Sequence, residues 1–193
     1  MVSACRAGGV ALVLALAACA SAPPPSAAPT FDANAAVALV RAAGQAQSSE
    51  LDVQPLRDPQ VEDLRQQAAQ QEKRQDFAAA AQALDHALSL QPADAQDPAV
   101  LQERAEIALL QRDLDGAETL ARKAITLGST TGPLCRRHWE TVLQVAQVRA
   151  QDRRYRGGES DAQATARVGA ADALVKQARA QRDACTIAAP ARY

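Results

Sequence analysis

The chain has 193 residues, and its 21 Lys and Arg against 22 Asp and Glu leave a formal net charge of −1 at pH 7. This balance excludes the strongly basic surface that general nucleic-acid binders carry. Aromatic residues make up only 3% of the chain, and alanine supplies much of its apolar fraction. Because alanine favours helices and alternating Val, Ile and Thr runs are lacking in the sequence, the composition predicts an all-α fold.

Residues 1–18 have the pattern of a secretory signal. One positive charge, Arg6, precedes an apolar run over residues 8–18, which is too short to cross a bilayer. The string that follows, Leu16-Ala17-Ala18-Cys19, resembles a bacterial lipobox. The resemblance implies a lipoprotein signal peptide over 1–18 and a lipidated, palmitate-bearing Cys19. The alternative is an ordinary signal that is cut after an alanine.

Residues 19–31 are rich in Pro, Ser and Ala, which cannot build a core, so we expect a tether. Ala20 follows the cysteine where an aspartate would resemble an inner-membrane retention signal. The lipoprotein resemblance therefore implies the outer membrane, with the folded part anchored by lipid and facing the periplasm.

Residues 32–58 form an N-terminal arm. Asp32 is a good N-cap for a short helix over 33–46. The segment 51–56 reads as extended chain because prolines follow closely. We expect Leu51, Val53 and Leu56 to pack on the helices that follow, and the alternative is a docking strip for a partner.

Two segments, at about 61–92 and 98–128, repeat one helix–turn–helix pattern. Aligning Phe77 with Leu114 gives an offset of 37 residues. It places small residues on small residues, which lets paired helices approach closely. Asp76 and Asp113 precede the two second helices, where Asp caps well. The aligned small residues of the two segments are Ala68, Ala80 and Ala87, then Ala105, Ala117 and Ala124.

Both segments resemble tetratricopeptide repeats, whose usual period is close to this offset. Gln75 and Arg112 stand where the family has a turn glycine, and neither segment has the Trp and Gly-Tyr of the fuller pattern. The alternative is a generic Ala-rich helical bundle.

A third hairpin follows, with helices expected over 135–151 and 161–184. Ser160 and Gln163 resemble a capping box at the start of the second. We therefore expect a short tetratricopeptide-repeat-like α-solenoid over 59–185, made of two repeats plus a disulfide-closed third hairpin or capping helix. Residues 186–193 form a tail.

Two cysteines remain once Cys5 leaves with the signal and Cys19 takes the lipid. Cys135 begins one predicted helix and Cys185 ends the next, and these ends meet in an antiparallel hairpin. An oxidising compartment then favours a disulfide between them. The alternative pairs Cys135 with His138 as half of a metal site or as a nucleophile, but a second pair and an orienting group are missing.

Other polar candidates have ordinary interpretations. His86 and His138 are expected to be structural, and Glu103, Glu106 and Glu118 to be solvated or paired within their helices with Arg104, Arg122 or Lys123. We therefore predict no catalytic residue, no metal site and no cofactor. One basic cluster could dock an acidic partner or an anionic glycan, or be a solvated turn; it comprises Arg136, Arg137, Arg149, Arg153, Arg154 and Arg156.

The strings DVQPLRDPQVEDLR, LQERAEIALL and LGSTTGPLCRRHWETV look like those of small tetratricopeptide-repeat lipoproteins of Gram-negative bacteria. The resemblance implies a non-enzymatic adaptor that binds another envelope protein or a peptide, and serves envelope, secretion or pilus assembly. The alternative is a lipoprotein that binds peptidoglycan or activates a wall synthase. The candidate partner-binding residues are Gln67, Gln71, Arg104 and Gln111.

Overall fold

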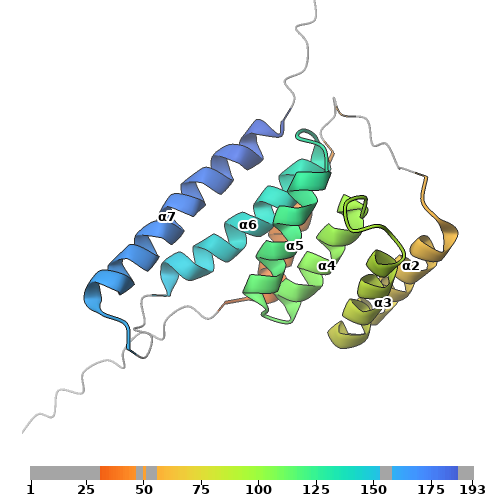
Figure 1. Cartoon of the computed structure of the whole chain (residues 1–193), viewed down its shortest axis with the longest axis horizontal. Coiled ribbons are helices and arrows are strands. Elements are labelled where there is room, and N and C mark those ends of the chain that lie inside the picture. Colours follow the sequence, from red (N-terminus) through yellow and green to blue (C-terminus); the bar gives the residue numbers. More distant parts are fainter. Residues whose placement is uncertain (1–30, 47–49, 51–55, 153–157, 187–193) are drawn as a thin grey trace, which may run out of the picture. The chain divides into compact units, whose positions relative to one another are not determined.

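The computed structural model describes residues 31–46, 50, 56–152 and 158–186. Within these ranges every regular element is an α-helix, which confirms the all-α prediction (Figure 1). The predicted signal peptide, Cys19 and nearly all of the predicted tether lie outside the described residues. The helices are α1 (Ala33–Ala43), α2 (Pro59–Lys73), α3 (Phe77–Ser89), α4 (Pro98–Leu110), α5 (Leu114–Leu127), α6 (Pro133–Gln151) and α7 (Asp161–Ala184).

Several helices begin at a short polar residue whose side chain accepts a hydrogen bond from a backbone N–H of the first turn. Asp32, Asp76 and Asp113 cap α1, α3 and α5 as predicted. Ser160 and Gln163 form the predicted capping box of α7. The first helices of the three hairpins share another device, a proline in the first turn, where its missing N–H costs nothing.

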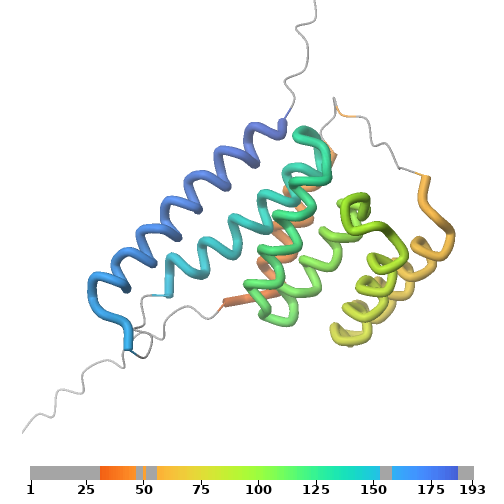
Figure 2. The backbone as a smooth tube through the Cα atoms, viewed as in Figure 1, coloured from red at the N-terminus to blue at the C-terminus, as the bar shows by residue number. Residues whose placement is uncertain are grey.

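The helices pack in chain order as three successive hairpins. α2 packs on α3, α4 on α5, and α6 on α7, while α3 contacts α4 and α5 contacts α6. α1 departs from this order, because it packs on α4 and α6 rather than on α2, the next helix in the sequence (Figure 2). The first helices of the second and third hairpins are therefore neighbours of the N-terminal arm.

The turns inside the first two hairpins have the same backbone geometry. Gln75 and Arg112 each have a φ of 62°, and they are the only non-glycine residues with positive φ in the described part of the chain. In both turns the N–H of the following Asp donates to a carbonyl five residues back, at 2.9 Å. The two residues with left-handed backbone are thus those that stand where tetratricopeptide repeats have a turn glycine, the residue that adopts this conformation most easily.

Small side chains form the contacts between the paired helices, as predicted. The six aligned alanines are all buried, and Leu84 and Leu101 fill the space beside them. Two expectations for the arm were wrong. α1 ends at Ala43 instead of extending to residue 46, and Leu56 is fully exposed instead of packing on the repeats. Leu51 and Val53 lie outside the described residues.

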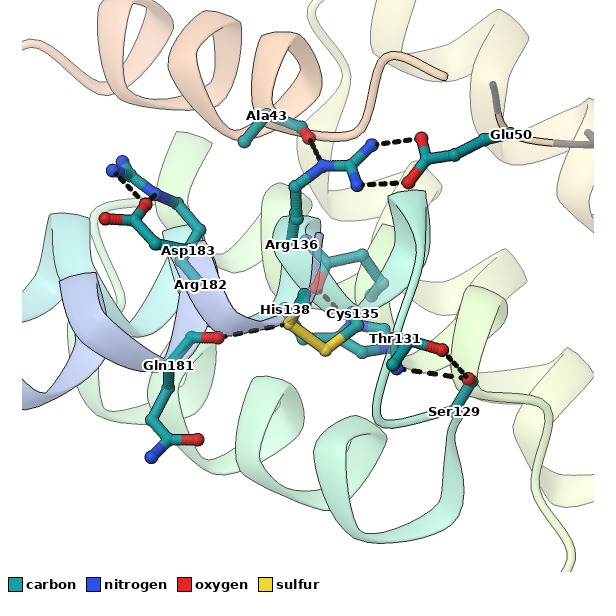
Figure 3. Close-up of a disulfide and its surroundings, with 12 residues drawn as sticks. Ala43, Glu50, Ser129, Thr131, Cys135, Arg136, His138, Gln181, Arg182 and Asp183 are labelled. Carbon is teal, nitrogen blue, oxygen red and sulfur yellow. Dashed lines mark hydrogen bonds and ion pairs between the residues drawn. A yellow bond between two sulfur atoms is a disulfide. The ribbon is translucent and has the colours of Figure 1, made fainter. Parts of the chain in front are cut away.

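The predicted disulfide joins the third hairpin. Cys135 and Cys185 are bonded, with their Cα atoms 5.7 Å apart (Figure 3). The N–H of Gly132 also donates to the carbonyl of Cys185 at 2.7 Å. The start of α6 is therefore tied to the end of α7 by a covalent bond and by a backbone hydrogen bond.

Candidate partner-binding surface

The first helices of the hairpins, α2, α4 and α6, contribute to one surface, part of which α1 covers. A hollow of about 180 Å³ lies between α1, α2 and α4, and we call it the inner hollow. Arg65, Gln66 and Glu72 of α2 line it, together with Arg41 of α1 and Glu103 of α4. Half of its ten lining residues are therefore charged.

A larger hollow, of about 750 Å³, lies where α2, α4 and α6 begin, and we call it the rim hollow. It has exposed apolar side chains, Leu56 and Leu90, with Leu134 beside them. Arg57 and Asp97 form an ion pair in its wall, 2.5 Å from nitrogen to oxygen. Apolar side chains next to paired charges are typical of surfaces that bind other proteins.

Ion pairs between helices hold the charged side chains of the inner hollow in place. Arg65 of α2 donates to Glu103 of α4 and to Glu62 one turn earlier. Arg41 of α1 donates to Glu72 of α2 at 2.9 Å. These pairs fix side-chain positions across three helices.

The side chain of Glu106 on α4 is fully buried among polar partners. One carboxylate oxygen accepts from Nε of Arg41 at 2.9 Å and from Nη2 of Arg137 at 2.8 Å. The other accepts from Nε of Arg137 and from the amide of Gln102. Pairing and hydrogen bonds of this kind offset the cost of burying a carboxylate. The expectation that Glu106 is solvated or paired within its own helix was wrong, since its side chain is buried and both arginines come from other helices.

His138 of α6 is also fully buried. Its Nδ1 lies 2.8 Å from Oε1 of Gln102, whose amide nitrogen donates to Glu106 and Thr141, so Nδ1 carries the proton. Nε2 has no hydrogen-bond partner in the described part of the chain. Burial, with a smaller effect of the positive charge of Arg137, lowers the pKa of His138 to about 3. The ring is therefore neutral at physiological pH.

Arg136 connects α6 to the chain that follows α1 (Figure 3). Its guanidinium donates to the carbonyls of Ala43 at 3.0 Å and Gln45 at 2.9 Å, and to both oxygens of Glu50. The hydrogen bond to Glu50 raises the pKa of Arg136. Its neighbour Arg137 is bound to Glu106, so neither side chain belongs to an open basic cluster.

The rest of that predicted cluster divides in two. Arg149 pairs with Asp115 at 2.5 Å and with Glu118, while Arg153, Arg154 and Arg156 lie outside the described residues. Glu118 also pairs with Arg122 one turn later, as predicted. Burial opposes the ionisation of Glu118, but the hydrogen bonds from its two arginines outweigh it and lower its pKa. Arg149 therefore acts as a link between α5 and α6.

The four predicted partner-binding residues do not come together in either hollow. Gln67 is exposed and Gln71 half-buried on α2, outside both linings. Arg104 donates to Asp85 of α3 at 2.8 Å. Gln111 donates to the carbonyl of Phe77 at 3.2 Å. Arg104 and Gln111 thus contact the preceding hairpin, and a partner-binding role for the four stays a prediction.

The residues that do line the inner hollow have a recognisable spacing. Five of the six α2 residues in its lining, Glu62, Arg65, Gln66, Ala69 and Glu72, lie at positions i, i+3, i+4, i+7 and i+10, which is one face of a helix. Alternating charges at that spacing could have indicated this face, although the partners of the charges on other helices could not be read from it.

The described part of the chain has no metal-binding cluster and no membrane-spanning helix. There, no group of three or more His, Cys, Asp or Glu is placed to hold a metal ion. His86 is exposed on α3, and His138 is buried on α6. None of the helices described is both long and apolar enough to cross a bilayer.

A scan against protein-family models, a search of curated proteins and a search of solved structures each found no match.

Proposed function

We propose that this protein is a non-enzymatic, tetratricopeptide-repeat-like adaptor. Lipid on Cys19 anchors it to the outer membrane, where it faces the periplasm and binds another envelope protein or a peptide. The process it serves is envelope, secretion or pilus assembly.

The repeated turn is the observation that carries the proposal. Gln75 and Arg112 have the same left-handed backbone 37 residues apart, each between two helices that pack through buried alanines. Hairpins stacked in chain order, with the first helices sharing a surface, are the arrangement by which α-solenoids build a binding face. This geometry supports a repeat scaffold over a generic bundle.

The composition of the rim hollow supports a protein or peptide as the partner. Leu56 and Leu90 are exposed there. Covering large aliphatic side chains with a partner is favourable, because it removes apolar surface from water. Paired arginines around them add hydrogen-bond donors that can orient a polypeptide. Binding through such a surface requires no catalytic group.

In-cell cross-linking of the full lipoprotein, followed by capture from membranes and mass spectrometry, tests the proposal. We expect one envelope protein to be recovered, and its yield to fall at least about tenfold with Leu56→Asp or Leu90→Asp. Leu39→Asp is the matched control, because Leu39 is an exposed leucine outside both hollows. Replacing Gln67, Gln71, Arg104 and Gln111 together tests the sequence-based assignment separately.

Recovery of muropeptides alone, with no specific protein, would contradict the adaptor proposal and favour the peptidoglycan-binding alternative.

The lipid anchor has its own test. Cys19→Ser should abolish palmitate labelling and move the protein from the membrane fraction to the periplasmic fraction, because a lipid chain supplies the membrane affinity.

A further inference from the structure

α1 lies on α4 and α6 as a one-sided helix. Val37 and Val40 are buried in one apolar cluster with Leu109 of α4 and Val145 of α6. The opposite face, which includes Leu39, is exposed. An amphipathic helix that lays its apolar face into a groove between two helices is a common mode of peptide recognition. We call the surface of α4 and α6 under α1 the α1 seat.

The buried carboxylate of the α1 seat, Glu106, keeps hydrogen-bond donors when α1 is absent. Arg41, which follows Val37 by one turn, reaches the buried Glu106 through Nε and Glu72 through Nη2. If α1 leaves, Glu106 still accepts from Arg137 and Gln102. Departure of α1 therefore leaves no unpaired buried carboxylate, which would otherwise forbid an open seat.

The apolar attachment of α1 is small. α1 has 11 residues, fewer than the roughly 12–15 that an isolated helix needs to be even marginally stable. Its buried residues are two alanines and two valines, Ala33, Ala36, Val37 and Val40. Elements with few buried apolar contacts open locally at lower free energy than the core. α1 also belongs to none of the three hairpins, so it can leave its place without opening one.

We infer that the α1 seat is a binding surface for a helix of a partner protein, and that α1 occupies it in the resting molecule as an intramolecular substitute. This inference rests on the proposed adaptor function and adds the class of partner. The partner is an amphipathic helix with small or β-branched residues at two positions three apart and an arginine immediately after the second, as Val37, Val40 and Arg41 are arranged. Arginine is specified over lysine because two nitrogens of one guanidinium contact two different carboxylates.

The chain after α1 keeps the displaced helix nearby. Leaving the seat breaks the bonds from Arg136 to the carbonyls of Ala43 and Gln45, whereas its bidentate bond to Glu50 lies beyond the helix. A tethered α1 competes at a high effective concentration. The seat is therefore available only to a helix that binds it more tightly than α1 does, which gives the surface selectivity.

Fluorescence anisotropy with a defined probe tests the inference. The probe is a labelled peptide with the sequence of residues 31–46, added to the full chain as wild type or Arg41→Glu. We expect the probe to bind the Arg41→Glu chain about tenfold or more tightly than the wild type, because the altered α1 competes less. Arg122→Glu is the matched control, since Arg122 is an exposed, paired arginine on α5, and it should match the wild type. The same peptide carrying Arg41→Glu should bind none of the three.

Hydrogen exchange on the wild-type chain provides a second readout that needs no variant to fold. We expect amides of α1 to exchange at least about tenfold faster than those of α4, and faster still when the peptide is added in excess. Exchange of α1 at the rate of α4, together with no peptide binding to the folded Arg41→Glu chain, would overturn the inference. Recovery of a partner by cross-linking in that case would leave the adaptor function standing and make α1 a permanent part of the scaffold.

Discussion

α1 and α7 both pack on α6, and they are held there by different means. α1 has 11 residues and buries four of them, and Arg41 and Arg136 add ion pairs and hydrogen bonds around it. α7 has 24 residues but buries only Ala171 and Ala178, and its end is bonded covalently through Cys185.

The longer helix, α7, thus buries fewer residues than the shorter α1, so helix length does not set how a helix is attached. The largely exposed, alanine-rich α7 packs on α6 through Ala178, with the half-buried Leu174 and Val175 beside it, and the disulfide fixes its end. α1 is attached only by contacts that can break and re-form. A helix held in this way can exchange with a partner, and one held by a disulfide in an oxidising compartment cannot.

Removing the disulfide should have the largest effect. We expect Cys135→Ser with Cys185→Ser to lower the free energy of unfolding by about 4 kcal/mol, because the bond spans 50 residues of chain. Urea unfolding of the two proteins measures the difference. Hydrogen exchange should show faster exchange in α7, with α1 little changed. An unchanged urea midpoint would mean that side-chain packing alone holds α7.

Shortening a buried side chain of α1 should act on α1 alone. Val40→Ala should lower the free energy of opening α1 by about 2 kcal/mol, because it leaves a small cavity in the α1 seat. Hydrogen exchange of residues 33–43 measures this, and residues 161–184 serve as the internal reference. Leu39→Ala is the control, and its effect should stay within about 0.5 kcal/mol because Leu39 is exposed. Equal acceleration in both helices would show that they open together.

Acid should weaken α6, to which both helices are attached. The pKa of His138 is about 3 in the folded protein, because burial disfavours the charged ring, and about 6.5 in the unfolded chain. Between these values the unfolded chain binds the extra proton, so stability is lost as the pH falls. We expect a loss of about 1 kcal/mol per unit between pH 6 and pH 5.

The histidine contribution can be isolated by comparing urea unfolding of the wild type and His138→Gln at the two pH values. Glutamine has no charge to gain, so its pH slope should be shallower by that amount. Parallel slopes would mean that the His138 ring titrates normally in the folded state.

Removing a helix cap should have a small and local effect. Asp32→Ala and Ser160→Ala should each cost about 1 kcal/mol, because an N-terminal N–H loses its acceptor. Hydrogen exchange should show the first change in α1 and the second in α7. Asp32→Asn should keep most of the stability, since asparagine also caps well. A loss with Asp32→Asn as large as with Asp32→Ala would show that the charge, and not the cap, matters.

Local features were predictable because they depend on residues only a few positions apart. The bounds of α7, its capping box and the Asp76 and Asp113 caps were all anticipated from such short-range patterns. The Cys135–Cys185 bond was also predictable, since the ends of two helices joined in a hairpin must meet.

Features that depend on contacts between distant residues were missed. Arg136 looked like part of a surface cluster, yet it is buried because Glu50 and two carbonyls, all more than 80 residues away in the chain, satisfy its donors. Glu106 looked like a helix-surface carboxylate, yet arginines from α1 and α6 enclose it. Leu56 looked like core and is exposed. Nothing in the local pattern of a charged or aliphatic residue says which other helix it meets.

The sequence by itself determined the helical class, most helix starts, the positions of the repeated turn and the pairing of the two cysteines, because propensity, capping and turn geometry act over a few residues. Only the tertiary structure decided where α1 lies, which charges are buried together, and which side chains line the two hollows. Those outcomes depend on a net gain from packing and ion pairing between residues far apart in the chain, and that gain exists only once the hairpins have come together.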